Sequence, residues 1–106
     1  MPEQAVFAAL ADANRRYLVE TLAARGTATA TQLAAELPVT RQAVAKHLAA
    51  LGDAGLVDAT RAGRELRYQL TPGPLTDAIA WMERVGARWD ERLEALRANV
   101  EAADRR

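Results

Sequence analysis

The chain contains no cysteine, a single lysine and a single histidine among its 106 residues. Without thiols it can form neither disulfides nor thiolate-bound zinc, copper or iron–sulfur sites. One histidine cannot build a metal site alone, so we predict no metal and no other cofactor. The sequence also lacks a phosphate-cradling glycine loop and a plausible nucleophile–base pair, which predicts that the protein is not an enzyme.

Long hydrophobic runs are missing as well. No stretch approaches the roughly 18 consecutive apolar residues that a membrane span requires, and the first ten residues lack the basic region of a signal peptide. We therefore expect a cytoplasmic protein with no membrane partner. The length suits one domain, which we predict to span residues 1–106.

An excess of positive charge is absent too, because acidic and basic residues balance to a net charge of zero. Taken alone, this balance argues against nucleic acid, since binding domains are usually basic. The charge is unevenly placed, however. Residues 14–68 contain eight basic side chains against five acidic ones, so the small positive excess belongs to the middle of the chain.

Apolar residues at helical spacing predict four helices in the first half of the chain, over residues 2–10, 12–26, 29–38 and 40–51. The expected boundaries are residues that start or stop helices, namely Asp12, Thr29 with Gln32 in a capping box, and Thr40 as starts, and Gly26, Pro38, Gly52 and Gly55 as stops. The third helix is therefore short, at about two turns.

The hydrophobic period changes from 3.6 to 2 in the segment after residue 55. Leu66, Tyr68 and Leu70 alternate with polar residues, which is typical of a strand with one buried face. We expect this strand to pair with residues 56–61 and to turn at Ala62-Gly63, giving a small hairpin over residues 56–70.

The longest helical signal covers residues 75–100. Its apolar residues follow steps of four and three, as in a coiled-coil seam: Leu75, Ile79, Met82, Gly86, Trp89, Leu93, Leu96 and Val100. About 39 Å of helix is more than so small a core can cover, so part of it should pack on another chain. Trp81 and Trp89 are expected to anchor the core or this interface, with a ligand pocket as the alternative.

Two short helices followed by a hairpin are typical of a helix-turn-helix with a wing. In the fourth helix Val44, Leu48 and Leu51 form the buried stripe, which leaves the polar side facing outward. The residues predicted to contact DNA are Thr40, Arg41, Gln42, Ala45, Lys46, His47, Arg61 and Arg64. Arg41 and Gln42 have the forked groups that read guanine and adenine.

Each of these assignments has a simpler alternative. A polar helix face is commonly just solvated. His47 suits either a half-buried packing position or a phosphate contact. Lys46 suits a phosphate contact. Arg61 and Arg64 flank the turn where a wing would meet the minor groove, but they could equally keep an edge strand soluble.

The stretch TQLAAELPVTRQAVAKHLAALGDAGLVDATRAGRELRYQL, preceded by ALADANRRYLVETLA, resembles the ArsR family of bacterial winged helix-turn-helix repressors. The resemblance rests on Ala11-Asp12, Arg15-Arg16, Gln32-Leu33-Ala34, Ala43-Val44, Lys46-His47-Leu48, Ala54-Gly55-Leu56-Val57, Gly63-Arg64 and Tyr68. It implies a mainly α fold with a small β-hairpin, in the order α-α-α-α-β-β-α.

The resemblance further implies a homodimer joined through the N-terminal helix 2–10 and the C-terminal helix 75–100. On this sequence the interface would comprise Phe7, Leu75, Ile79, Met82, Trp89, Leu93 and Leu96. Metal-sensing relatives carry cysteines near the recognition helix, or histidines and carboxylates in the last helix. This chain has no cysteine and no histidine there, so it is similar to the metal-free branch, whose signals are varied.

These features together predict a homodimeric, sequence-specific repressor that binds a palindromic operator in double-stranded DNA through residues 40–51 and the wing. The resemblance implies that it represses its own operon and is released by an unidentified effector, such as a small molecule. The alternative is a winged-helix module whose same face binds a protein without specific DNA binding.

Overall fold

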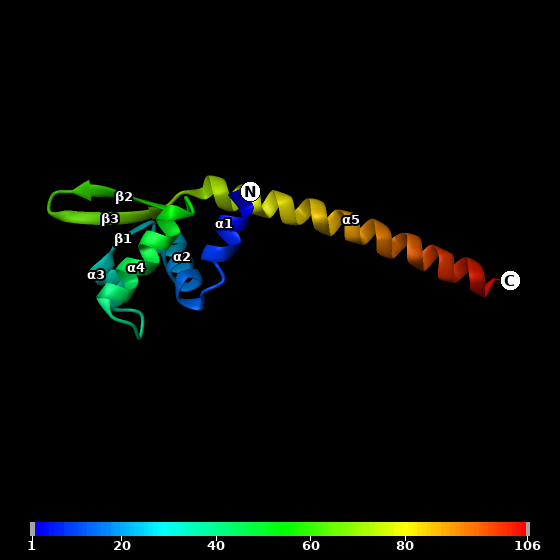
Figure 1. Ribbon diagram of the computed structural model, residues 1–106, viewed down its shortest axis with the longest axis horizontal. Helices are drawn as coiled ribbons and strands as arrows, with labels where there is room; N and C mark the ends of the chain where they lie inside the picture. Colours follow the sequence, from blue (N-terminus) through cyan, green and yellow to red (C-terminus); the bar gives the residue numbers. More distant parts are fainter. Residues whose placement is uncertain (1, 106) are drawn as a thin grey trace.

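The computed structural model describes residues 2–105, so Met1 and Arg106, the ends of the predicted domain, lie outside the described residues. Figure 1 shows a body of short helices and a hairpin from which one long helix extends. In chain order the elements are α1 (Pro2–Ala9), α2 (Ala13–Arg25), β1 (Thr27–Thr29), α3 (Ala30–Ala34), α4 (Arg41–Asp53), β2 (Val57–Ala62), β3 (Glu65–Leu70) and α5 (Pro72–Asp104).

The predicted N-caps are confirmed. The Asp12 carboxylate accepts hydrogen bonds from the backbone amides of Asn14 at 2.8 Å and Arg15 at 3.2 Å. Thr29 and Gln32 form the reciprocal capping box, with distances of 2.9 and 3.1 Å. The Thr40 hydroxyl accepts from the Ala43 amide at 3.1 Å. Each cap satisfies a donor that the helix itself leaves unpaired.

The predicted end of the third helix is wrong, and of the two predicted stops of the fourth helix only Gly55 is confirmed. The third helix stops at Ala34 instead of continuing to Pro38, because proline restricts the residue before it and the chain tightens into turns over residues 35–39. In α4, Gly52 lies inside the helix and Gly55 ends it with φ of +76°. The amide of Leu56 then donates to the Leu51 carbonyl at 2.9 Å, the bond of a Schellman motif.

The sheet has three strands in the order β1-β3-β2, where the sequence predicted only the hairpin. Strand β1 was missed because three residues show no readable period, and its partners in β3 lie about forty positions away. The predicted turn is also displaced by one residue. Ala62 pairs with Glu65, which leaves Gly63-Arg64 as a two-residue loop. Gly63 has a φ of +64°, as the first position of such a hairpin loop demands.

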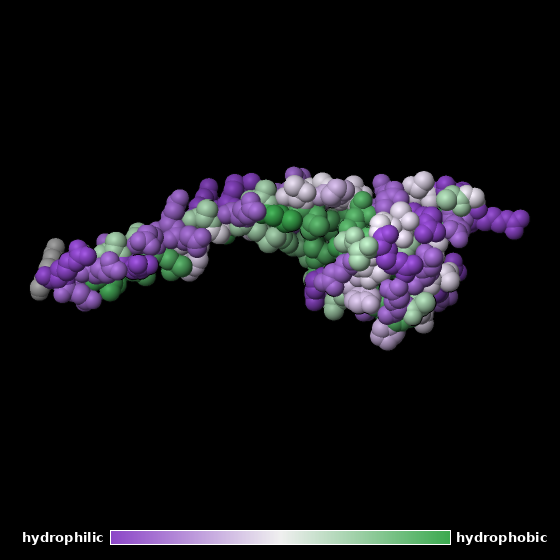
Figure 2. Space-filling model, turned by 180° about the vertical axis from the view of Figure 1, so that it is seen from behind, coloured by the Kyte–Doolittle hydropathy of each residue, from purple (hydrophilic) through white to green (hydrophobic). Residues whose placement is uncertain are grey.

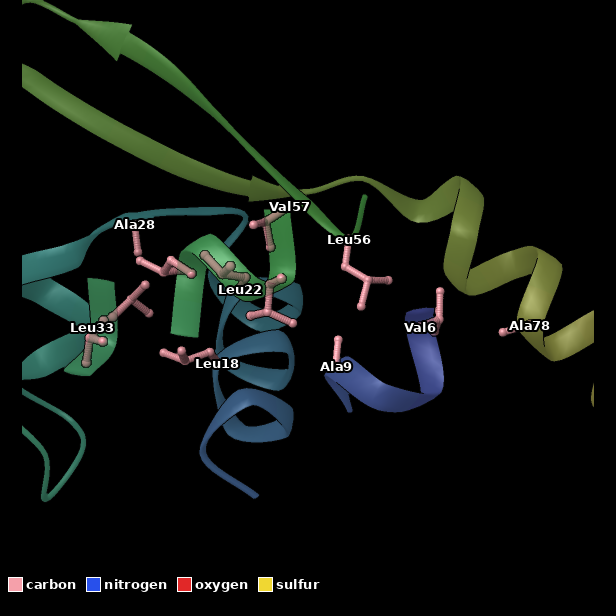
Figure 3. Close-up of a cluster of buried hydrophobic side chains, with 12 residues drawn as sticks. Val6, Ala9, Leu18, Leu22, Ala28, Leu33, Leu56, Val57 and Ala78 are labelled. Carbon is pink, nitrogen blue, oxygen red and sulfur yellow. The ribbon is translucent and has the colours of Figure 1, made fainter. Parts of the chain in front are cut away.

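Leucine, valine and alanine side chains from α1, α2, β1, α3, α4, β2 and α5 form the core, as Figure 3 shows. Leu18, Leu22 and Leu48 are each at most 1% exposed, and a leucine buried this fully contributes roughly 1.5–3 kcal/mol. The hairpin extends beyond this core. For that reason Leu66 is exposed, contrary to the predicted buried face, whereas Tyr68 and Leu70 pack against the core.

Two arginines tie α1 to α2. The Arg15 Nε donates to the Ala9 carbonyl at 2.6 Å, and an Arg16 guanidinium nitrogen donates to the Leu10 and Ala11 carbonyls at 2.7 and 3.1 Å. These carbonyls are at and after the end of α1, where a helix leaves acceptors unpaired. The guanidinium groups of Arg15 and Arg16 are therefore engaged in hydrogen bonds within the chain.

Helix α5 begins at Pro72, three residues earlier than predicted, because prolines are tolerated in a first turn where the amides have no helical partner. Only Thr71 separates it from β3, and the Thr71 amide donates to the Leu56 carbonyl at 2.8 Å. Near its start, Ala78 is buried and the rings of Phe7 and Trp81 lie 5.5 Å apart. Figure 2 shows hydrophobic residues gathered where α1 meets α5.

Beyond that contact the helix leaves the body, and the molecule measures 75 × 26 × 22 Å. Seven large apolar residues of α5 are exposed, whereas Leu75 and Trp81 are half-buried: Ile79, Met82, Val85, Trp89, Leu93, Leu96 and Val100. Within residues 2–105, no helix combines the length and the apolar character that crossing a membrane requires.

Candidate nucleic-acid interface

Helix α4 has two distinct sides. Val44, Leu48 and Leu51 are at most 1% exposed and pack in the core, as the sequence predicted. The opposite side is open to solvent and comprises Arg41, Gln42, Ala45, Lys46 and Ala49. The two alanines keep this exposed side low, so that the helix axis can approach a surface closely, with longer polar groups beside them.

The wing arginines lie across a cleft from the start of α4. Arg41, Arg61 and Arg64 all line this cleft, which has a volume of about 510 Å³ and also borders α3. Arg64 occupies the tip of the hairpin and Arg61 precedes the turn in β2. Three arginines, from α4 and from the hairpin, therefore line one concave surface, an arrangement suited to polyanions.

An adjoining cleft of about 420 Å³ is lined by Ala30, Arg41, Gln42, Ala45 and Tyr68. It places the predicted base-reading residues beside the half-buried tyrosine of β3. Lys46 and His47 line neither cleft, since they lie further along α4. The structure thus brings together the first turn of α4 and the wing, and leaves Lys46 and His47 outside both clefts.

Sequence reasoning missed several residues of this surface. Thr31 and Tyr68 line the larger cleft, together with Glu65. Arg67 pairs with the Glu65 carboxylate at 2.8 Å and donates to the Thr27 hydroxyl at 3.1 Å, which places a cation beside the acidic group of the cleft. The pairing of Glu65 with Arg67 could have been predicted from the sequence, because residues two apart in a strand share a face.

His47 is half-buried, as one of its two sequence interpretations requires. The amide of Arg15 holds the pKa of the Asp12 carboxyl below its ordinary value, and burial opposes the shift. The amide of Asn14 and then the positive charge of His47 lower the pKa further. The backbone hydrogen bonds that make Asp12 the N-cap of α2 are therefore the main cause of its lowered pKa.

Arg15 and Arg16 belong to the basic middle of the sequence but not to this surface, because they cap α1. Thr40 also has a structural role, as the N-cap of α4. Among residues 2–105, no three His, Cys, Asp or Glu side chains are grouped closely enough to hold a metal ion. Trp81 packs on Phe7, while Trp89 is 60% exposed, and neither lines the clefts described above.

Comparison with known proteins gives the family. Residues 10–59 match a helix-turn-helix domain model. The chain is 36% identical to the uncharacterized HTH-type transcriptional regulator YuzN of Bacillus subtilis, over 76% of this chain and 96% of that protein.

Solved structures agree with this assignment. An ArsR-like transcriptional regulator from Rhodococcus sp. RHA1 is 44% identical and superimposes with a TM-score of 0.78, covering 90% of this chain and 89% of that one. A second structure, described as an ArsR family transcriptional regulator, is 29% identical with a TM-score of 0.75, covering 84% of this chain and 91% of that one. The chain therefore belongs to the ArsR family of winged helix-turn-helix, DNA-binding transcription regulators, which are not enzymes.

Proposed function

We propose that this regulator is a homodimeric, sequence-specific repressor that binds an inverted-repeat operator through α4 and the wing. The observation that carries the proposal is the lining of one cleft by Arg41, Arg61 and Arg64 beside the exposed side of α4. A helix face that is merely solvated does not require arginines from two elements on one surface. DNA binding does, because the protein contacts phosphate groups and base edges from several directions at once.

The base-reading part of the proposal concerns the first turns of α4. Arg41 donates in a fork to guanine, and Gln42 both donates to and accepts from adenine. Ala45 and Ala49 let the helix enter the major groove without steric conflict. Thr40 starts the helix at the edge of this surface, where its cap orients the first turn.

The remaining contacts are to the DNA backbone and the minor groove. Lys46 and His47 lie further along the helix, where phosphates flank the groove. Arg64 at the tip of the wing, with Arg61 before it, reaches the adjacent minor groove. That Arg64 shares a cleft with Arg41 supports this role over mere solubility of an edge strand.

Dimerisation is proposed through α1 and α5. The interface residues are Phe7, Leu75, Ile79, Met82, Trp89, Leu93 and Leu96, of which the last five are exposed in the single chain. A two-fold axis then places two α4 helices in successive major grooves, roughly 34–36 Å apart. Leu93→Asp should abolish both the dimer and operator binding, and a variant that still sediments as a dimer would contradict this interface.

The proposed regulation is negative and autogenous, so that the operator lies upstream of the protein's own gene. Release follows a signal other than a thiolate-bound metal, because the chain has no cysteine.

The deciding experiment is a salt-titrated binding assay with DNA from upstream of the gene, alongside an unrelated duplex of equal length. We expect clear preference for the upstream fragment, and footprinting should reveal two protected half-sites in inverted repeat. A Gln42→Ala, Lys46→Ala double variant should lose that preference. Equal, weak binding to both duplexes would contradict the proposal and favour a module that binds another protein.

A further inference from the structure

Glu65 brings a negative charge to a surface that is otherwise basic. It directly follows the two-residue loop Gly63-Arg64 at the tip of the hairpin, and it lines the same cleft as the three arginines described above. Of the described residues that line this cleft, Glu65 alone is acidic. DNA binding depends on the attraction of cations to phosphates, so a carboxylate at the tip of the wing lowers the affinity for DNA of any sequence. General attraction to DNA therefore does not explain why an acid stands here.

The Glu65 carboxylate is oriented from one side. Its Oε2 accepts a hydrogen bond from a guanidinium nitrogen of Arg67 at 2.8 Å, and the Arg67 Nε donates to the Thr27 hydroxyl at 3.1 Å. Thr27 belongs to β1, so the carboxylate is linked through Arg67 to the neighbouring strand of the sheet. Within residues 2–105 the other carboxylate oxygen, Oε1, accepts no hydrogen bond, and the Glu65 side chain is 57% exposed. The wing tip therefore presents an oriented acceptor that is open to solvent.

The chemistry of the minor groove limits what this acceptor can bind. The proposed function places the wing tip in the minor groove, whose floor shows acceptor atoms at every base pair. The N2 amino group of guanine is the one hydrogen-bond donor on that floor. A·T pairs offer no donor there, and A-tracts narrow the groove and make its potential more negative, which repels a carboxylate. The cost of the charge is therefore offset only where a G·C pair lies beneath Glu65.

We propose that Glu65 reads a G·C pair in the minor groove, by accepting a hydrogen bond from guanine N2 while the adjacent Arg64 donates to an acceptor of the same base pair. This inference rests on the proposed function and names a specificity-determining residue of the wing. The two residues are consecutive, so the wing tip offers a donor beside an acceptor. The minor-groove edge of guanine has the complementary order, with the acceptor N3 beside the N2 donor. An arginine alone lacks this selectivity, because every base pair offers it acceptors.

The ion pair with Arg67 does not by itself account for Glu65. It joins two residues of one strand, with 29% of the Arg67 side chain and 57% of the Glu65 side chain exposed, and surface pairs of this kind contribute little to stability. Its clear effect is on orientation. A carboxylate that is already held in place loses less conformational freedom when it binds a base, whereas solubility of the hairpin requires no such support.

Selection of binding sites from a library of random duplexes tests the base preference. Wild-type sites should contain a G·C pair at the minor-groove positions that hydroxyl-radical footprinting shows to be protected. Glu65→Ala should select sites in which those positions vary, while the positions read by α4 stay the same. The unchanged α4 positions also show that the variant is folded.

Asp58→Ala is the matched control, because Asp58 is an exposed acid of β2 that lines neither cleft. Both variants remove one negative charge from the hairpin, so both should bind unrelated DNA more tightly than the wild type does. Only Glu65→Ala should lose the G·C preference. Loss of that preference in Asp58→Ala as well would show that charge alone is responsible, and would overturn the proposal.

Inosine substitution identifies the group that is read. Inosine pairs with cytosine and differs from guanine only in lacking the N2 amino group, so the major-groove edge is unchanged. Replacing the wing-contacted guanine of one half-site by inosine should weaken wild-type binding about tenfold, as one lost hydrogen bond to a charged group predicts. The same replacement should change the binding of Glu65→Ala by less than about twofold. An equal effect on both proteins would overturn the proposal, because the amino group would then act through the shape of the DNA.

The outcomes separate this inference from the proposed function. If the selection yields no common inverted repeat, the proposed function and the role of Glu65 are both wrong. If it yields an inverted repeat whose wing-contacted positions accept A·T pairs or inosine without loss of affinity, only the role of Glu65 is wrong.

Discussion

Replacing Lys46 by alanine should change how strongly salt weakens operator binding. Four exposed cations form the proposed DNA surface of each protomer, namely Arg41, Lys46, Arg61 and Arg64. A cation that enters a groove displaces condensed counterions as a cation on a phosphate does, so the eight cations of a dimer predict a slope of log affinity against log salt of about −7, at about −0.9 each. Raising salt from 50 to 200 mM should then lower the affinity by about 10⁴-fold.

Lys46→Ala removes one phosphate contact per half-site, so the slope should fall to about −5 and the same salt change should cost only about 10³-fold. Fluorescence anisotropy with labelled operator across several salt concentrations measures this slope. Arg84→Ala is the control, because Arg84 is exposed on α5 away from the proposed surface. An unchanged slope for Lys46→Ala, or an equal change for Arg84→Ala, would refute the phosphate role.

Three further predictions concern recognition, packing and pH. Gln42→Ala should lower the binding free energy by about 1–3 kcal/mol and relax the base preference at one operator position. Equal losses of affinity on every base-substituted operator would show instead that Gln42 contacts the DNA backbone. Leu48→Ala should lower the free energy of unfolding by about 2–5 kcal/mol, because Leu48 is 1% exposed. Urea denaturation measures that loss, and a change below about 1 kcal/mol would contradict the packing described. The folded state lowers the pKa of Asp12, so the stability from this cap is present above the ordinary carboxyl pKa of 3.8 and lost as the pH falls through the lower folded value. Thermal melts from pH 6 to 2 should therefore show a smaller acid loss for Asp12→Asn than for wild type, and identical losses would contradict the shift.

The helices could be predicted closely because their signals are local. A cap such as Asp12 or Thr40 acts within three residues, and the stripe of Val44, Leu48 and Leu51 repeats within one helix. Gly52 was misplaced as a terminator because two glycines compete for the end of α4. Only the φ of +76° and the Schellman bond identify Gly55 as the true stop.

The features that were missed depend on contacts distant in sequence. Strand β1 exists because Ala28 pairs with Tyr68, and nothing within three residues announces that pairing. Leu66 alternates correctly but lies on a part of the hairpin that extends beyond the core, so its exposure could not be read from the period. The cleft shared by Arg41 and Arg64 required both the wing and α4 to be placed in space.

Thr71 is the single residue between β3 and α5, so no flexible linker joins the wing to the long helix. Its amide donates a hydrogen bond to the carbonyl of Leu56, which ties the start of α5 to the junction between α4 and β2. In the proposed dimer these short connections hold the two α4 helices at one spacing. Inserting one base pair between the half-sites would shift one of them by about 3.4 Å and turn it by roughly 35°, and no linker can follow that movement. The spacing between the two half-sites then determines which operators the dimer binds, in addition to their base sequence.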